Sequence, residues 1–400
     1  MNYAEESLKL HKKWHGKLET VPKMEIHDKE ALSLAYTPGV AQPCLAIKEK
    51  KEKVWEYTSR GNLVAVVSDG TAVLGLGNIG PEAGLPVMEG KAVLFKHFAD
   101  IDAVPLCLGK VFNEKGRTDA AKVIETVERL EPTFGGINLE DIGAPACFEV
   151  EQTLKKKMNI PVFHDDQHGT AIITCAAILN ALKVVGKKRG DLKIVVNGAG
   201  AAGIAITELI LDLHLGSVIL CDSKGIVMEG NPRNNAGKEE IAHRTNPIHQ
   251  SGTLKEAIHN ADVFVGVSQA NMVTPEMVRS MDRDPIIFAM ANPVPEIMPD
   301  AAKEAGAVVV GTGRSDFPNQ VNNVLVFPGF FKGLLRVGAT KVTQEMKIRA
   351  AEALASVITD EELNADYVLP DAFDERVADA IADAVSAEAV ASGVCRPIHR

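Results

Sequence analysis

Two pairs of acidic residues stand at the ends of apolar segments, where carboxylates can do chemistry. Glu140 and Asp141 end an expected short strand, and Asp165 and Asp166 precede an expected long apolar helix. Clustered oxygen ligands suit Mg2+ or Mn2+ better than zinc. Either aspartate can instead cap the helix that follows, and any single acid can be a solvated loop residue. Taken together, the four acids predict a site for a hard divalent cation.

Two histidines flank the second acidic pair, His164 and His168. Only a helix would bring residues four apart onto one face, and Gly169 and the acids predict that the helix begins later, near Thr170. We therefore do not expect these histidines to bind zinc.

Proton transfer has two candidate residues. Tyr36 lies in a Tyr-Thr-Pro-Gly turn that would hold its ring rigidly, and a phenol can donate a proton if a neighbour assists it. Lys91 follows a glycine and opens an apolar run, where burial can lower its pKa towards that of a general base. The simpler interpretations are a ring packed on a turn for Tyr36 and a solvated ammonium group for Lys91.

A complete G-x-G-x-x-G motif lies between an apolar strand and an apolar helix, and it consists of Gly198, Ala199, Gly200, Ala201, Ala202 and Gly203. Such glycines let the backbone approach a pyrophosphate at a helix N-terminus, although they can also serve close packing alone. The next strand ends at Asp222, where an acid can bind a ribose hydroxyl and favour NAD. Lys224 can instead pair with the 2′-phosphate of NADP, so the sequence leaves the choice of cofactor open.

A second match to the same motif spans residues 75–80. It follows Asp69-Gly70, a pair that favours a two-residue hairpin turn, so we expect residues 71–75 to return as an antiparallel strand. A dinucleotide site needs a parallel strand that feeds a helix. We therefore predict that this second motif is a loop lining the substrate cleft.

Asparagines follow several later strands. Asn292, Asn322 and Asn323 lie in loops that face the ligand crevice if the sheet is doubly wound. Their amides can bind the nicotinamide ribose or a substrate carboxylate, or they can be ordinary turn residues.

Short apolar runs alternate with helical stretches in the second half of the chain, at 192–196, 217–221, 262–267, 285–290 and 307–310. This alternation predicts a parallel, doubly wound sheet. The expected fold is α/β, with an N-terminal α/β catalytic domain (1–164), a Rossmann-type NAD(P)-binding domain (165–372) and a C-terminal helical tail (373–400). We interpret the tail as a packing or subunit-contact element.

The composition narrows the class of protein. A formal net charge of −10 argues against a nucleic acid or an anionic membrane as a main partner. No uninterrupted apolar run approaches the roughly 18 residues of a membrane span, and the start of the chain lacks the features of a leader peptide. The six scattered cysteines look like reduced thiols. We expect a cytoplasmic protein.

Seven segments in order resemble the malic enzyme family, specifically its short prokaryotic branch. They read YTPGV, GLGNIG, GKAVLFK, NLED, HDDQHGT, GAGAAG and QVNNV, and the resemblance extends from about Leu32 to Gly333. No length remains for the phosphotransacetylase-like extension of some relatives. One position departs from larger family members, because Ala72 stands where they carry an arginine for a substrate carboxylate.

The resemblance implies a role for each candidate. Tyr36 is the general acid, Lys91 is the general base, and Asp165 supports the site by steering Lys91. The metal ligands are Glu140, Asp141 and Asp166. The residues that bind cofactor or substrate are the 198–203 loop, Asp222, Asn292, Asn322 and Asn323.

The implied reaction is the oxidation and decarboxylation of malate to pyruvate and CO2 with NAD or NADP and Mg2+ or Mn2+, and oxaloacetate decarboxylation can accompany it. The family suggests a homodimer whose active sites are built from two chains. Two alternatives stay open at this point: an oxidative decarboxylase of another hydroxy acid, and a nucleotide sensor that keeps the fold without the catalysis.

Overall fold

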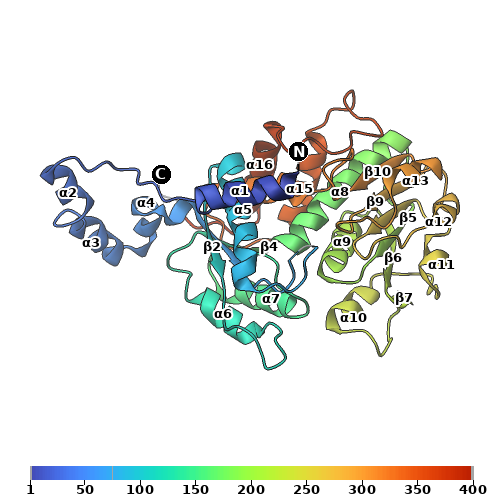
Figure 1. The fold of residues 1–400 in the computed structure, drawn as a ribbon, viewed down its shortest axis with the longest axis horizontal. Coiled ribbons are helices and arrows are strands. Elements are labelled where there is room, and N and C mark those ends of the chain that lie inside the picture. Colours follow the sequence, from blue (N-terminus) through green and yellow to red (C-terminus); the bar gives the residue numbers. More distant parts are fainter. Residues whose placement is uncertain (1, 74, 398–400) are drawn as a thin grey trace.

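Two parallel β-sheets, joined by one long helix, form the body of the molecule (Figure 1). The structure is a computed structural model that describes residues 2–73 and 75–397. It confirms the predicted α/β class. The domain boundaries at 164/165 and 372/373 remain predictions, since one continuous apolar core includes side chains from both sheets.

The N-terminal sheet has four parallel strands in the order β2-β1-β3-β4. They span Leu63–Ser68 (β1), Asp102–Cys107 (β2), Gly136–Leu139 (β3) and Val162–His164 (β4). The helices between them are Pro81–Ala99 (α5), Ala120–Glu128 (α6) and Ala146–Lys157 (α7). Because all four strands run the same way, the residues that follow them, including Glu140 and Asp165, meet at one edge.

The predicted hairpin after β1 is wrong. The described residues 69–73 and 75–80 form a loop that leads directly into α5, and β1 pairs with parallel strands on both sides. Leu74, part of the predicted return strand, lies outside the described residues. Gly70 has a positive φ of 69°, but Asp69 does not have the positive φ that this hairpin turn also requires. The Asp69 carboxylate instead accepts hydrogen bonds from Thr71 and from Thr118, 49 residues away, and these contacts direct the loop along the sheet edge.

The second sheet has the strand order β10-β9-β8-β5-β6-β7. Its strands are Leu192–Asn197 (β5), Gly216–Asp222 (β6), Gly225–Ile226 (β7), Val263–Gly266 (β8), Ile286–Ala289 (β9) and Val309–Thr312 (β10). All are parallel except β7, a two-residue antiparallel strand that the sequence did not predict. If the strands of this sheet are numbered from one to six along the chain, their order is 3-2-1-4-5-6. This is the order of a doubly wound dinucleotide-binding fold.

Five shorter helices accompany these strands: Ala201–Asp212 (α9), Ala236–Ala242 (α10), Leu254–Ile258 (α11), Pro275–Arg279 (α12) and Pro299–Glu304 (α13). The predicted glycine motif falls between β5 and α9. This is the position that a phosphate-binding turn occupies in such folds.

Helix α8 (Asp165–Val185) connects the two sheets. It begins at Asp165, one turn before the position expected from the sequence, so both acids of the pair lie in its first turn. By length and composition alone it could cross a membrane, but 78% of its apolar window is buried inside the protein. The apolar character of α8 is therefore that of a helix in the protein core.

Three helices close the C-terminal part of the chain: Phe327–Arg336 (α14), Gln344–Ser356 (α15) and Arg376–Ala391 (α16). Helix α16 packs closely against α14. A Cβ atom at Gly329 would lie 2.7 Å from the carbonyl oxygen of Ala378, and one at Gly333 would lie 2.7 Å from that of Ala382. The predicted tail helix is thus a packing element of the body.

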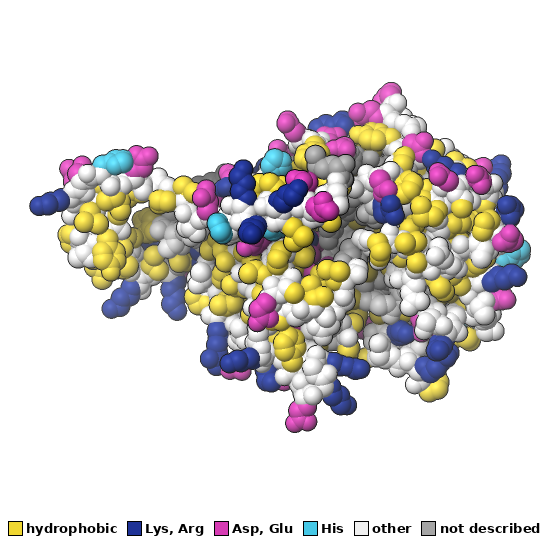
Figure 2. Space-filling view, viewed as in Figure 1, with side chains coloured by type: hydrophobic (Ala, Val, Ile, Leu, Met, Phe, Trp, Pro, Cys, Tyr) yellow, Lys and Arg dark blue, Asp and Glu magenta, His cyan; other side chains and the backbone are white. Residues whose placement is uncertain are grey.

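Residues 18–59 project from the body and are called the arm below (Figure 1). Helix α1 (Tyr3–Trp14) precedes the arm, which contains Lys29–Ala35 (α2), Ala41–Glu49 (α3) and Val54–Tyr57 (α4). Much of its apolar surface is exposed, including Leu34 at 66% and Leu45 at 56% (Figure 2).

Candidate active site

A buried cluster of charged side chains lies at the edge of the N-terminal sheet. The Lys91 Nζ atom, from α5, is 2.6 Å from Asp165 Oδ2 and 2.9 Å from Glu140 Oε1. The three side chains are at most 8% exposed. Asn323 donates a hydrogen bond of 2.6 Å to the same Asp165 oxygen, and Asn138 donates one of 2.9 Å to Glu140. The structure therefore brings together Lys91, Glu140, Asp165 and Asn323.

The local sequence explains how this cluster is held. Gly169 lies one turn after Asp165, and a Cβ atom there would be 2.0 Å from Asp165 Oδ1, so only glycine leaves room for the carboxylate. The Lys91 ammonium group lies 4.1 Å from the centre of the Phe327 ring, which adds a favourable cation–π contact. Backbone space and an aromatic face thus fix the two charges relative to each other.

The protonation of Lys91 differs from the sequence-based expectation. Burial alone would lower the pKa of Lys91, but the charges and hydrogen bonds of Asp165 and Glu140 outweigh it and raise the pKa above its usual value. The expectation of a lowered pKa for Lys91 was therefore wrong, because the sequence did not reveal how close the two carboxylates lie.

The acids themselves have shifted pKa values. Burial raises the pKa of Asp165 to about 7 and that of Asp166 to about 6, although the Lys91 charge opposes both shifts. The pKa of Glu140 is also raised, by burial and by the nearby Asp166. Glu140 and Asp165 are buried, whereas the Asp166 side chain is 36% exposed, and one ammonium group is too little positive charge for the three carboxylates.

The cluster fits a divalent cation in charge and in donor type. Buried carboxylates need compensating positive charge, and Asp165 Oδ1 is buried without a hydrogen-bond partner. Oxygen-only donors are those that Mg2+ and Mn2+ prefer. Within residues 2–73 and 75–397, however, no three His, Cys, Asp or Glu side chains already converge as a metal site.

Asp141 and Asp166 are linked through the backbone. The Asp141 N–H group donates a hydrogen bond of 2.7 Å to Asp166 Oδ2, and Asp141 has a positive φ of 54°. The Ala72 N–H group donates to the Asp141 carbonyl oxygen at 3.0 Å, which brings the loop with the second glycine motif beside the acids. That this loop lines the substrate cleft remains a prediction.

Tyr36 does not join the cluster within one chain. It ends α2 in the arm, its side chain is 68% exposed, and no hydrogen bond among the described residues connects it with Lys91. The site of one chain therefore lacks the expected general acid.

The predicted dinucleotide site has the geometry that its chemistry requires. Gly198 has a φ of 121°, and a Cβ atom there would lie 2.4 Å from the Val267 carbonyl oxygen. A Cβ atom at Gly203 would lie 1.7 Å from the Gly198 carbonyl oxygen, so this glycine allows α9 to approach the loop. Gly200 is the N-cap of α9, is exposed and would meet nothing, which leaves the helix N-terminus open to a phosphate group.

Asp222 is the last residue of β6, as predicted, but it is not a free carboxylate. Lys238 Nζ lies 2.6 Å from its Oδ2 atom, and the Lys224 N–H group donates to its Oδ1 atom. These contacts outweigh the effect of partial burial and lower the pKa of Asp222.

The structure also places the other residues that the sequence singled out, namely two asparagines and two histidines. Asn292 is exposed in the loop after β9, and Asn322 accepts a hydrogen bond from the Val324 N–H group, which makes it a helix cap. His168 lies inside α8, where its ring contacts Glu151 and Lys347. His164 is buried, and both its ring nitrogens lack a hydrogen-bond partner.

Three residues of the site were not among the candidates predicted from the sequence. Asn138 and Phe327 contact Glu140 and Lys91, and the buried Glu296 organises the crevice by accepting hydrogen bonds from Ser268 and Ala291. Asn138 lies on β3 two residues before Glu140, which directly follows that strand, so the alternation of side chains along a strand could have linked the two. The positions of Glu296 and Phe327 depend on tertiary contacts that no local pattern reveals.

A doubly wound sheet with an open helix N-terminus, together with a buried Lys–carboxylate cluster, defines the class of dinucleotide-dependent oxidoreductases. Family models for the malic enzyme N-terminal domain and the malic enzyme NAD-binding domain match residues 15–155 and 167–390. The chain belongs to the malic enzyme family.

Similar proteins cover nearly the whole chain. It is 59% identical to the bifunctional malic/malolactic enzyme of Bacillus subtilis, over 99% of this chain and 95% of that protein. It is 50% identical to the NADP-dependent malic enzyme of Escherichia coli, over 96% of this chain and 52% of that longer protein. The crystal structure of the NAD-dependent malic enzyme of Thermotoga maritima has a TM-score of 0.90 at 52% identity, covering 95% of this chain and 98% of that one.

Proposed function

We propose a mechanism in which Lys91 takes the hydroxyl proton of malate while a second chain supplies Tyr36. As a malic enzyme, the protein oxidises and decarboxylates malate to pyruvate and CO2 while NAD or NADP is reduced. The observation that carries the proposal is the buried position of Lys91 between Asp165 and Glu140.

Lys91 must lose its proton before it can act as a base. The carboxylates of Asp165 and Glu140 hold that proton on Nζ. A divalent cation bound by Glu140, Asp141 and Asp166 would compensate those carboxylates and supply positive charge beside the substrate oxygens. Lys91 Nζ, oriented by Asp165, then accepts the proton of the malate hydroxyl group. A dinucleotide held at the 198–203 loop would supply the hydride acceptor.

Burial contributes to this step in two ways. The low exposure of Lys91 and Asp165 excludes water from the proton-transfer path. The second contact of Asp165, with Asn323, fixes the carboxylate so that it can orient Nζ at the substrate. We propose that Asn292 and Asn322 face the same crevice from the nucleotide side.

We propose a homodimer in which each arm reaches into the site of the partner chain. After CO2 has left, the enol carbon of pyruvate needs a proton, and Tyr36 is the donor in this proposal. The arm exposes Ile26, Leu32, Leu34, Tyr36 and Leu45, each at least 50% exposed, and such a patch is unusual on a monomer. A symmetric pair of chains would bury both patches and complete both sites.

We propose that the enzyme accepts both NAD and NADP. The carboxylate of Asp222, which would repel a 2′-phosphate group, is paired with Lys238, and Lys224 lies next to it in the same loop. Lys238 can therefore turn to a 2′-phosphate while Asp222 remains available for a ribose hydroxyl. The six cysteines are all free thiols, which is consistent with our proposal of a cytoplasmic enzyme.

A mixed-dimer experiment tests the mechanism. Lys91→Met chains and Tyr36→Phe chains are each expected to be inactive as homodimers. Co-expressed, they should form heterodimers with one intact site, built from Tyr36 of the first chain and Lys91 of the second. Malate-dependent NADH formation should then return to a substantial fraction of that of the unaltered dimer.

Two outcomes would contradict this mechanism. Activity of the Lys91→Met homodimer near that of the unaltered enzyme would exclude Lys91 as the base. Two inactive homodimers that form heterodimers without recovering activity would exclude a site shared between chains. If Lys91→Met chains do not fold, Glu140→Gln chains replace them as the partner that lacks a working cluster.

A further inference from the structure

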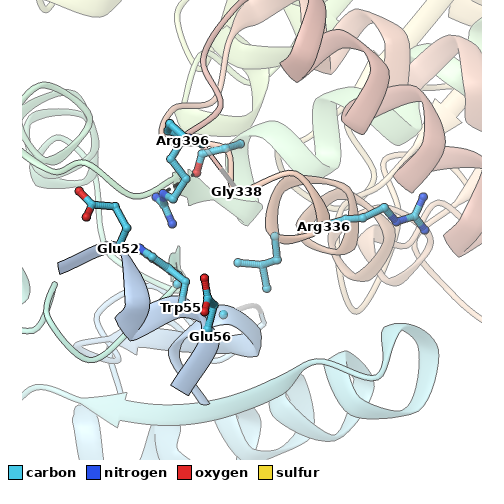
Figure 3. A pocket seen from close by; sticks show the side chains of 11 residues that line it. Glu52, Trp55, Glu56, Arg336, Gly338 and Arg396 are labelled. Carbon is cyan, nitrogen blue, oxygen red and sulfur yellow. Dashed lines mark hydrogen bonds between the residues drawn. The ribbon is translucent and has the colours of Figure 1, made fainter. Parts of the chain in front are cut away.

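At the base of the arm, two guanidinium groups stack on one aromatic ring. The Arg396 guanidinium carbon lies 3.6 Å from the centre of the Trp55 ring (Figure 3). The Arg60 guanidinium carbon lies 4.2 Å from it. Trp55 belongs to α4, Arg60 follows the arm, and Arg396 lies in the C-terminal tail. We call this arrangement the Trp55 clamp.

Each arginine is anchored by backbone atoms of the body. Arg60 donates hydrogen bonds to the carbonyl oxygens of Glu131 and Phe134, at 2.7 and 3.1 Å. Arg396 donates to the carbonyl oxygen of Asn159 at 2.9 Å. The charge of Glu131 acts on both guanidinium groups, but no ion pair of either with a carboxylate occurs among the described residues. Their free faces are thus committed to the tryptophan ring.

The tail that carries Arg396 is fixed in turn. The Arg396 N–H group donates to the Gly338 carbonyl oxygen at 3.0 Å, and the Thr340 N–H group donates to the Val394 carbonyl oxygen at 2.8 Å. These bonds pair the tail in an antiparallel manner with the segment after α14. The C-terminal tail therefore connects the arm to the helices of the body.

Little else among the described residues holds the arm. Apart from the bond that the Arg60 N–H group donates to Thr58 Oγ1, the hydrogen bonds and ion pairs described for residues 18–59 stay within that segment, and Trp55 is the one apolar side chain described there that packs against a body core cluster. Beside Trp55 lies a cavity of about 160 Å3, lined by Glu56, Leu335, Gly338 and others. Because this cavity adjoins the ring, the stacked guanidinium groups are among its main contacts with the body.

We propose that the Trp55 clamp positions the arm so that Tyr36 reaches the site of the partner chain. This rests on the proposed function, in which Tyr36 acts across the dimer. Trp55 and Arg396 are positioning residues, because neither touches the reacting atoms. The clamp acts on the arm of its own chain and should therefore affect only the site that this arm completes.

The mixed dimer reveals which chain needs the clamp. One chain carries Lys91→Met and supplies Tyr36, and the other carries Tyr36→Phe and supplies Lys91. Adding Arg396→Met to the chain that supplies Tyr36 should lower malate turnover about tenfold, as expected for loss of a stacked cation. Adding it to the chain that supplies Lys91 should change turnover by less than about twofold, within the effect of an ordinary surface substitution.

Control variants separate positioning from general damage. Arg336→Met alters another arginine that lines the cavity, but its guanidinium group points away, towards Asp379 and Asp383, and should leave turnover unchanged (Figure 3). Trp55→Phe keeps an aromatic face and should retain most of the activity that Trp55→Leu loses. The affinity for NADH, measured by fluorescence, should be the same in all of these variants.

The outcomes are distinct. Equal losses from either placement of Arg396→Met, or no loss from either, would overturn the role of the clamp while leaving the shared site intact. Heterodimers of the two parent chains that form but show no activity would instead refute the shared site, and the role of the clamp with it.

Discussion

The Lys91 cluster and the arm both carry residues with the chemistry of a proton-transfer site, yet they are held in opposite ways. Lys91 is buried and contacts two carboxylates and an aromatic ring. Tyr36 is 68% exposed on a segment attached mainly through Trp55. The difference teaches that the base is fixed by the fold of one chain, whereas the position of the acid depends on the arm and, in our proposal, on assembly.

The largest expected effect separates the two regions by stability. Lys91→Met and Tyr36→Phe should each lower malate turnover by about 10^2 to 10^4, the usual contribution of a general base or acid. Only Lys91→Met should also lower the free energy of unfolding, by about 3 kcal/mol, because it leaves buried carboxylates without a counter-charge. Denaturant unfolding of both variants measures this, and equal stability losses would contradict the contrast.

A second prediction concerns the exposed face of the arm. Leu34→Asp places a charge on a side chain that is 66% exposed in one chain. It should shift the protein from dimer to monomer in sedimentation and abolish most turnover, while secondary structure by circular dichroism stays unchanged. Lys48→Asp is a control on the same arm. A dimeric and active Leu34→Asp variant would show that this face does not contact a partner.

A third prediction extends the comparison to the nucleotide crevice, which, like the Lys91 cluster, is formed within one chain. Lys238→Ala removes the partner of Asp222. The kcat/KM for NADP should fall about tenfold relative to that for NAD, as expected for loss of one charged contact and exposure of a repelling carboxylate. Steady-state rates with both cofactors measure this ratio, and an unchanged ratio would exclude Lys238 as a phosphate contact.

The last prediction concerns stability rather than turnover, and it lies behind the cluster, where α15 meets α8. Lys347 contacts His168 at 3.0 Å, and burial, aided by the charge of Lys155, lowers the pKa of Lys347 from 10.5 to about 7. Between these pH values the unfolded chain binds a proton that the folded chain does not, so this group makes stability rise with pH.

The variant Lys347→Met tests this sign. Between pH 7 and 10.5 its free energy of unfolding should rise less steeply than that of the unaltered enzyme, by up to about 1.4 kcal/mol per pH unit. Below that range the two slopes should coincide. Identical slopes throughout would show that Lys347 keeps an ordinary pKa in the folded protein.

Local patterns predicted much of the architecture. The apolar runs of the second half became parallel strands because buried strands of such sheets are continuously apolar, and the glycine motif followed its strand directly. The grouping of Glu140 with Asp165 could also be anticipated, because both residues follow parallel strands that the structure places side by side in one sheet.

The features that the sequence did not predict depend on contacts between residues that are far apart in the chain. Asp69-Gly70 looks like a hairpin turn, but Thr118, distant in sequence, binds the aspartate. The direction of the Lys91 pKa shift depends on two carboxylates whose distances no spacing reveals. Tyr36 lies outside the cluster because the arm projects from the body and makes few contacts with it. No local sequence pattern reveals this course of the chain.

Helix α8 has a mechanical consequence for the Lys91–Asp165 pair. It runs without interruption from the acids in its first turn to its packing against α9 and α15 on the nucleotide side. Asp165 nevertheless follows β4 directly, so it lies on the first sheet's side together with Lys91 and Glu140. Asn323, which also holds Asp165, comes after β10 of the second sheet. A swing of one sheet relative to the other would therefore leave Lys91 beside Asp165 and pull on the bond between Asp165 and Asn323, so that opening the crevice frees the carboxylate that orients the base.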